Sequence, residues 1–241
     1  MENYEFFNIP RSCEVKNTIF KKLFYENAGL SAADKTLFTD SISKITWLYC
    51  LKPETINIQP YKDDTREYEE VEIIEVELDK EKRTDRIAEI VMRNIPYPTV
   101  LVFRLHQKIK LYVAHQRNSL SDNSKNAIEE LVSTEWVDND SVLLEKLDIM
   151  QMRFTNFYAL YSDIVDIMSI YNLSEIMATD ENITGAEARE LSAKIEDIEQ
   201  DIASLRAKLK KESQFNRKME LNIEIKRLEQ LKNKFTGGKS Q

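Results

Sequence analysis

The chain has 241 residues, of which 42% are hydrophobic and 32% charged, and its formal net charge is −8. This length suits one sizeable domain with an appendage, or two small domains. No apolar run approaches the ~20 residues that span a bilayer, and no secretory signal follows the acidic start, so a cytoplasmic protein is expected. With only four glycines, a glycine-rich phosphate-binding loop is excluded.

Charge is distributed unevenly along the chain. Residues 184–241 contain 13 basic and 10 acidic residues, a balance of +3, whereas the rest of the chain has a balance of −11. An acidic body with a slightly basic C-terminal segment is not the profile of a wholly cationic nucleic-acid binder. It leaves room for a local basic contact near the C-terminus.

The first third of the chain alternates helical and extended patterns. Apolar spacing predicts a helix over residues 15–25, and Ser31 with Asp34 resembles the cap that begins a second helix. Alternating apolar residues predict a buried strand over residues 44–51 and a short one at 56–58. Because strands follow helices without strict alternation, this order is typical of an α+β domain.

A strong strand pattern covers residues 68–78. Its apolar residues are expected to point inward and Glu72, Glu75 and Glu77 outward, with a phase slip at the centre that suggests a β-bulge. An amphipathic helix follows over residues 83–93. Further strands are expected over 99–105, 108–115 and 132–137. Together these elements predict a mixed, mainly antiparallel sheet with flanking helices, forming a domain over residues 1–140.

The rest of the chain is predicted to be helical. Residues 141–180 should form connecting helices packed on the body, and residues 181–236 a coiled-coil arm that begins at a capping box of Thr184 and Glu187. Residues 237–241 would be a disordered tail. The arm's apolar residues follow heptad spacing. This seam comprises Leu191, Ile195, Ile198, Ile202, Leu205, Leu209, Leu221, Ile225 and Leu228.

The seam loses its apolar residues between Lys210 and Asn216, so two structures compete. In one, the chain reverses near residues 212–216 and forms an antiparallel hairpin that buries its own seam. In the other, one helix about 75 Å long pairs with another chain. The fading seam favours the hairpin, and the oligomeric state stays open between a monomer with a hairpin and a dimer.

In a hairpin, the reversal would form a basic tip with one acid, Glu212. Such a tip can contact the phosphates of a nucleic acid or a nucleoprotein partner. An ordinary solvated tip would have the same composition. The basic residues are Arg206, Lys208, Lys210, Lys211, Arg217 and Lys218.

Glu75, Glu77 and Asp79 are the candidates for catalysis. Carboxylates on one strand face can hold Mg²⁺ for phosphodiester cleavage. A restriction-nuclease type of site also needs an acid-x-Lys triplet, which the neighbouring lysines do not supply. The solvated face of an exposed strand explains the same pattern. The histidines and cysteines lack ligand spacing, so no metal and no cofactor is expected.

Several segments resemble those of an uncharacterised prokaryotic family, catalogued as domain of unknown function 4391. They are residues 21–25, 45–49, 51–58 and 95–98, with Lys211, Glu212, Phe215, Asn216 and 220–222 of the arm. The resemblance covers essentially the whole chain and implies no activity and no catalytic residue. Members are often encoded near DNA methyltransferase and helicase genes of restriction or anti-phage islands. The resemblance therefore implies a defence-system accessory protein, with a methyltransferase or helicase as its protein partner.

These features predict a non-enzymatic interaction protein that uses the arm to engage a protein or nucleic-acid partner. They combine a poor catalytic inventory with a strong heptad pattern. Two alternatives stay open: a metal-dependent, nuclease-like subunit, and a scaffold that self-associates through the arm. No membrane partner is expected.

Overall fold

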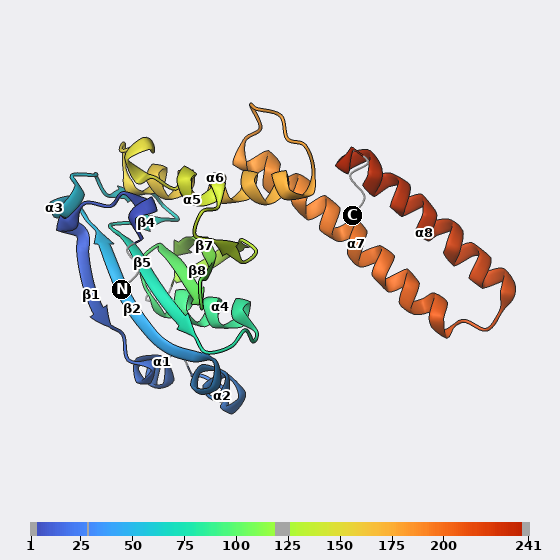
Figure 1. The fold of residues 1–241 in the computed structure, drawn as a ribbon, viewed down its shortest axis with the longest axis horizontal. Coiled ribbons are helices and arrows are strands. Elements are labelled where there is room, and N and C mark those ends of the chain that lie inside the picture. Colours follow the sequence, from blue (N-terminus) through green and yellow to red (C-terminus); the bar gives the residue numbers. More distant parts are fainter. Residues whose placement is uncertain (1–3, 28, 119–125, 238–241) are drawn as a thin grey trace. The chain divides into compact units, whose positions relative to one another are not determined.

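The computed structural model describes residues 4–27, 29–118 and 126–237, which form the helices and strands drawn in Figure 1. The chain divides into two compact units, Met1–Ile167 and Met168–Gln241. The division between the units lies inside helix α6 (Phe157–Ile176). The sequence pattern instead predicted domain boundaries near residues 140 and 180. No helix in the described part of the chain has the length and hydrophobicity needed to cross a membrane.

The first unit is built on a mixed, mainly antiparallel sheet, as predicted (Figure 1). In the described residues its strand order is β1-β2-β5-β6-β7-β8, and β9 also pairs with β7. β5 and β6 run parallel because helix α4 (Thr84–Asn94) connects them, and the other neighbours are antiparallel. The strands are β1 Glu14–Thr18, β2 Ile42–Leu51, β5 Val71–Leu78, β6 Thr99–Leu105, β7 Lys108–Asn118, β8 Asn126–Ser133 and β9 Val137–Asp138.

Helices α1 (Lys21–Asn27), α2 (Ala32–Ser41) and α4 share one core with the sheet. In this core Phe38 and Ile87 are fully buried against strand residues such as Phe103. The Ser31 hydroxyl accepts the N–H of Asp34 and caps α2, as predicted. The Asp34 carboxylate in turn accepts hydrogen bonds from Arg86 at 3.0 and 3.1 Å, which ties α2 to α4.

The first turns of α6 pack on strands β6 and β7. The fully buried Tyr161 hydroxyl donates to the carbonyl oxygen of Thr99 at 2.9 Å and accepts the N–H of Ala114 at 3.0 Å. A small hairpin of β3 (Tyr61–Lys62) and β4 (Glu67–Tyr68) lies outside the main sheet. The remaining short helices are η1 Glu5–Phe7, η2 Arg11–Cys13, α3 Pro53–Ile56, α5 Val142–Lys146 and η3 Ile149–Gln151.

Three short elements differ from the prediction. The strand expected over residues 132–137 is not continuous, because β8 ends at Ser133 and β9 begins at Val137. Residues 15–25 are not one helix, because Glu14–Thr18 pairs with β2 as an edge strand and only Lys21–Asn27 is helical. Pairing with a neighbouring strand outweighs the local helical spacing, as tertiary contacts often do. The expected strand at 56–58 is also absent, since Pro53 opens a helical turn that ends at Ile56.

The largest difference concerns the glutamates of β5. The prediction that they point into solvent was wrong: Glu72 and Glu75 are 3% and 9% exposed. The strand is central, with β2 and β6 paired along its two edges, and residues on both of its faces are buried. The predicted bulge exists opposite Ile73 and Ile74, but the extra residue is Leu48 of β2.

The second unit contains the predicted antiparallel hairpin of α7 (Gly185–Lys211) and α8 (Phe215–Thr236), visible in Figure 1. The capping box of Thr184 and Glu187 is present at the start of α7. Gly237 ends α8 in a left-handed conformation, and residues 238–241 of the expected tail lie outside the described residues. The chain reverses at residues 212–214, within the expected range.

The seam packs mostly within the hairpin. Ile198 and Ile202 of α7 are buried against Ile225 and Leu228 of α8, with Leu205 and Leu209 partly buried beside them. Leu191 and Ile195, at the start of α7, instead pack near Leu173 of α6. Ion pairs of Arg206 with Glu229 (2.7 Å) and of Lys232 with Glu199 (2.5 Å) cross-link the two helices.

Two isoleucines of α8 offer a matched test of this packing. Ile225 is 6% exposed in the seam, and Ile223 is 63% exposed on the outer face. We expect Ile225→Ala to lower the opening free energy of the hairpin by about 2–4 kcal/mol, and Ile223→Ala to change it by less than about 0.5 kcal/mol. Hydrogen exchange of the α7 and α8 amides measures this opening. Equal effects of the two substitutions would contradict the buried seam.

Candidate functional sites

Two of the three predicted catalytic carboxylates are paired with a cation. The Arg104 guanidinium lies between Glu75 (3.1 Å) and Glu77 (3.0 Å), and the Tyr4 hydroxyl donates a hydrogen bond to Glu75. Burial and the Glu75 carboxylate raise the pKa of Tyr4 well above its ordinary value, so its hydroxyl stays protonated. Asp79 is exposed just beyond the end of β5. This arrangement is a partly buried ion-pair cluster rather than an open magnesium site.

A second cluster of acidic groups lies on the opposite face of β5. Cys50 is the direct register partner of Glu72, because the extra residue Leu48 turns Cys50 to the face that Trp47 and Glu72 share. Glu70 precedes β5, and its carboxylate accepts a hydrogen bond from the Cys50 thiol at 3.6 Å. One potential ligand atom from each of Cys50, Glu70 and Glu72 lies within 4.8 Å of the others.

Burial changes the protonation of this cluster. Desolvation raises the pKa of Glu72 to about 8, an effect that the Trp47 hydrogen bond opposes and nearby Glu70 increases. Burial and the two carboxylates also raise the pKa of the Cys50 thiol. The cluster was not predicted from the sequence, because Cys50 and Glu72 come together only through the strand pairing of β2 and β5.

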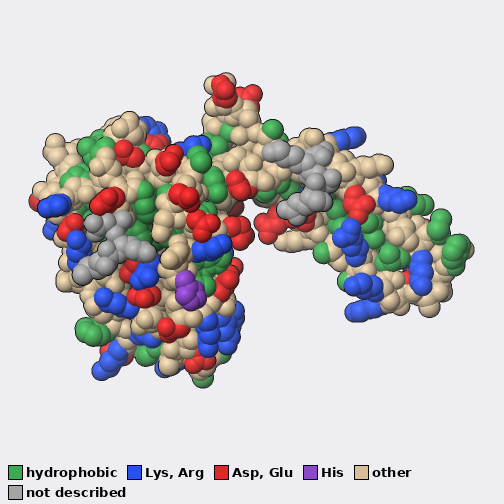
Figure 2. Space-filling model, viewed as in Figure 1, with side chains coloured by type: hydrophobic (Ala, Val, Ile, Leu, Met, Phe, Trp, Pro, Cys, Tyr) green, Lys and Arg blue, Asp and Glu red, His purple; other side chains and the backbone are tan. Residues whose placement is uncertain are grey.

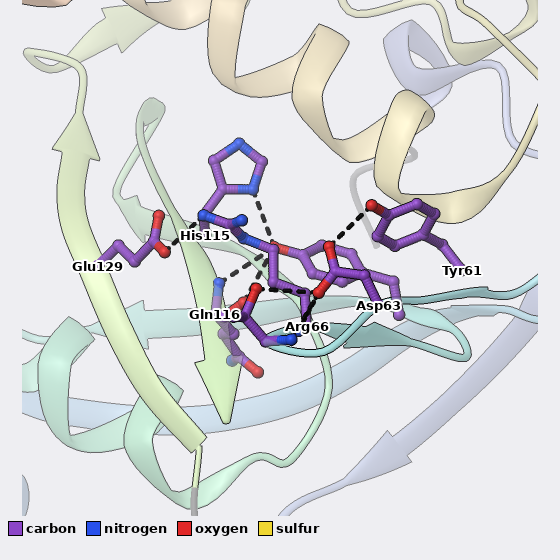
Figure 3. Close-up of polar contacts among 8 residues, drawn as sticks. Tyr61, Asp63, Arg66, His115, Gln116 and Glu129 are labelled. Carbon is purple, nitrogen blue, oxygen red and sulfur yellow. Dashed lines mark hydrogen bonds and ion pairs between the residues drawn. The ribbon is translucent and has the colours of Figure 1, made fainter. Parts of the chain in front are cut away.

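A polar network joins the β3–β4 hairpin to β8, as Figure 3 shows. Arg66 Nη2 donates to Glu129 Oε1 at 2.7 Å. The Asp63 carboxylate accepts the Tyr61 hydroxyl at 2.8 Å and the backbone N–H of Arg66 at 2.7 Å. The Asp63 carboxylate also accepts the backbone N–H of Thr65. This bond, followed by the Tyr61 hydroxyl, holds the pKa of Asp63 well below its ordinary value.

The same network continues to β7 through Tyr68. Its buried hydroxyl lies 2.8 Å from His115 Nδ1 and accepts the backbone N–H of Gln116 at 3.1 Å. Burial raises the pKa of Tyr68 well above its ordinary value, so the hydroxyl remains a neutral hydrogen-bonding group. Since these polar groups bond to one another, the network explains how the β3–β4 hairpin is held against β7 and β8 (Figure 3).

The basic tip lies at the reversal between α7 and α8. Arg206 is paired with Glu229, whereas the other five basic residues are exposed and form no ion pair with the described residues. Glu212 accepts the backbone N–H groups of Ser213 (2.8 Å) and Gln214 (2.9 Å), and these bonds lower its pKa. The single acidic residue of the tip, Glu212, therefore stabilises the turn. The other five basic residues are Lys208, Lys210, Lys211, Arg217 and Lys218.

An exposed apolar stripe, which we define as Phe215, Met219 and Ile223, runs along α8 from this tip. These side chains are 74%, 49% and 63% exposed. With 3.6 residues per turn, positions four apart share a face, and this face lies opposite the seam residues Ile225 and Leu228. Figure 2 shows hydrophobic side chains at this end of the hairpin beside Lys and Arg side chains. This spacing of four residues is visible in the sequence, but it was not predicted as a site because the heptad pattern is the stronger signal in this segment.

Comparison with known proteins gives one match. A family model described as a domain of unknown function, DUF4391, matches residues 7–231. No curated protein and no solved structure matches the chain. The family match confirms the resemblance drawn from the sequence.

Removing the cation between Glu75 and Glu77 tests the ion-pair cluster. We expect Arg104→Met to lower the free energy of unfolding by about 2–4 kcal/mol, because it leaves half-buried carboxylates without their cation. Arg153, paired with Asp163 at the surface, is the matched control. Arg153→Met should cost less than about 1 kcal/mol. Urea denaturation measures both, and a similar small loss in each variant would contradict the assigned role.

The raised pKa of Glu72 predicts a pH dependence of stability. In the native state Glu72 keeps its proton up to about pH 8, whereas in the unfolded state it releases the proton near its ordinary pKa of 4.5. The free energy of unfolding therefore falls as the pH rises between these two values. Glu72→Gln should flatten this fall, whereas Glu130→Gln, at an exposed position, should not. Urea denaturation at several pH values, with a chelator present to remove metal ions, measures the slope of the unfolding free energy against pH. An unchanged slope in Glu72→Gln would contradict the assignment.

Proposed function

Since the chain belongs to the DUF4391 family, whose function is unknown, we propose its role from its own geometry. It is a non-enzymatic interaction protein whose α7–α8 hairpin binds an acidic partner protein. The contact surface is the exposed apolar stripe on α8 together with the basic tip beside it.

The exposed apolar stripe carries this proposal. Phe215 and Ile223 are separated by eight residues, about 12 Å along a helix, and both are mostly exposed. Burying such side chains is favourable by roughly 25 cal/mol per Å². A helix that presents apolar residues at every fourth position fits an apolar groove of another protein. The hairpin has no need of these residues, because its seam packs on the opposite face of α8.

Charge defines the chemistry of the partner. Arg217 and Lys218 lie in the first turn of α8 next to the stripe, and Lys208, Lys210 and Lys211 lie across the turn. A groove with an apolar floor and an acidic rim complements this surface. The phosphates of a nucleic acid would contact the lysines and arginines of the tip but would leave the apolar stripe exposed. A protein partner therefore accounts for more of the surface.

The other two hypotheses have less support. For a nuclease-like subunit, Arg104 occupies the space between Glu75 and Glu77 that a metal ion would need. For a scaffold that self-associates through its seam, Ile198, Ile202, Ile225 and Leu228 are already buried within one hairpin. Docking of two stripes would also bring two basic tips together.

The cellular setting comes from the family resemblance. It implies an accessory role in a DNA restriction or anti-phage defence system, with a methyltransferase or helicase as partner. In this proposal, the partner presents the acidic groove and the hairpin delivers the protein to it. The basic tip then steers the encounter, which should weaken as salt screens the charges.

A triple substitution of the stripe tests the proposal. Phe215→Ser, Met219→Ser and Ile223→Ser in the full-length protein should weaken the partner complex at least about 30-fold, because a single buried anchor contributes about 2 kcal/mol, which corresponds to that factor. The control is Val142→Ser with Met150→Ser, which removes exposed apolar side chains from the first unit. Both forms are compared with wild type by tagged recovery from the host and by affinity measurement with the recovered partner.

Three outcomes would contradict the proposal. The triple variant could bind the same partner as tightly as wild type. Sedimentation could show that wild type forms dimers that the triple variant does not, which would assign the stripe to a second copy. Fluorescence anisotropy could show tight binding to duplex DNA that depends on the basic tip and not on the stripe.

A further inference from the structure

The Cys50, Glu70 and Glu72 cluster lies in the first unit and plays no part in the proposed hairpin contact. One sulfur and two carboxylate oxygens lie within 4.8 Å of one another. Zinc binds thiolate sulfur at about 2.3 Å and carboxylate oxygen at about 2.0–2.2 Å in a tetrahedral site. Such bonds place donor atoms about 3.5 Å apart, close to the 3.6 Å between Cys50 Sγ and Glu70 Oε2.

Backbone structure holds two of these side chains in place. Cys50 and Glu72 are register partners in adjacent antiparallel strands, so their Cβ atoms are close on one face. The bulge at Leu48 produces this pairing, and bulges commonly redirect a side chain. Glu72 is also oriented by Trp47, whose indole N–H donates to its carboxylate at 2.5 Å. Outer-sphere donors of this kind orient metal-ligating carboxylates.

The two acid clusters of β5 differ in one respect. On one face, Arg104 forms ion pairs with both Glu75 and Glu77. On the other, neither Glu70 nor Glu72 forms an ion pair with any described residue, although Glu72 is almost fully buried. A buried carboxylate with a second carboxylate nearby and no cation is costly to ionise. A bound cation would supply the missing charge.

We propose that Cys50, Glu70 and Glu72 bind a divalent transition-metal ion, with zinc the best match. The thiol and any protonated carboxyl release their protons as the metal binds. A thiolate ligand disfavours Mg²⁺ and Ca²⁺, and two carboxylate oxygens disfavour Cu(I), which prefers sulfur. Three protein ligands leave a fourth tetrahedral position for water. Glu70 is only partly buried, so solvent reaches the cluster on the side of this residue.

Cobalt substitution tests the site without any assay of activity. We expect the chelator-treated, full-length protein to bind one Co²⁺ per chain, with the absorption of a thiolate–cobalt bond. Cys50→Ser should abolish this absorption. Cys13→Ser is the matched control, because Cys13 is a buried cysteine whose thiol bonds to the Thr55 carbonyl oxygen outside the cluster. That variant should bind Co²⁺ as wild type does, and excess Zn²⁺ should displace the cobalt in both.

Two further variants keep the test decisive if Cys50→Ser fails to fold. Glu72→Gln retains the cysteine and should weaken Co²⁺ binding at least about tenfold. Trp47→Phe should retain the thiolate absorption but weaken binding about 10- to 100-fold, as expected for loss of an outer-sphere donor. Circular dichroism establishes that each variant is folded. The proposal is overturned if folded wild type shows no thiolate absorption, or if the absorption survives Cys50→Ser or is lost in Cys13→Ser.

Discussion

The first unit depends on how a glutamate-rich strand is accommodated at the centre of its sheet. β5 has neighbours on both sides and covered faces above and below, yet it carries Glu72, Glu75 and Glu77. A buried carboxylate must find a cation, a hydrogen-bond donor or a proton. The protein uses different partners on the two faces: Arg104 and Tyr4 on one, and Trp47 with Cys50 and Glu70 on the other. Both candidate sites of this unit follow from that constraint.

The second unit obeys a simpler rule. The heptad seam is buried between α7 and α8, so the opposite face of α8 is not needed for packing within the hairpin. That face presents three large apolar side chains beside a turn rich in lysine and arginine. In a hairpin stabilised by its own seam, such residues have no role in the fold. Their placement is the reason for assigning the hairpin to partner recognition.

Prediction succeeded where the signal was local. The capping box of Thr184 and Glu187, the heptad spacing and its loss near Ser213 were all readable in the sequence, and the hairpin forms as expected. The cap of α2 at Ser31 was equally local. Prediction failed for residues 15–18 and 56–58, where strand pairing or a proline-initiated turn outweighs apolar spacing. It also overlooked the exposed apolar stripe, because the seam dominates the periodicity of α8.

The sequence by itself determined the α+β class of the first unit and the helical hairpin of the second, since both depend on periodicity and capping over a few turns or strands. Only the tertiary structure decided the environment of the β5 glutamates. The bulge in β2, the central position of β5 and the arrival of Arg104 from β6 join residues far apart in the chain. An alternating pattern alone does not distinguish a solvated edge strand from a central strand whose charges are paired, because the partners come from other strands.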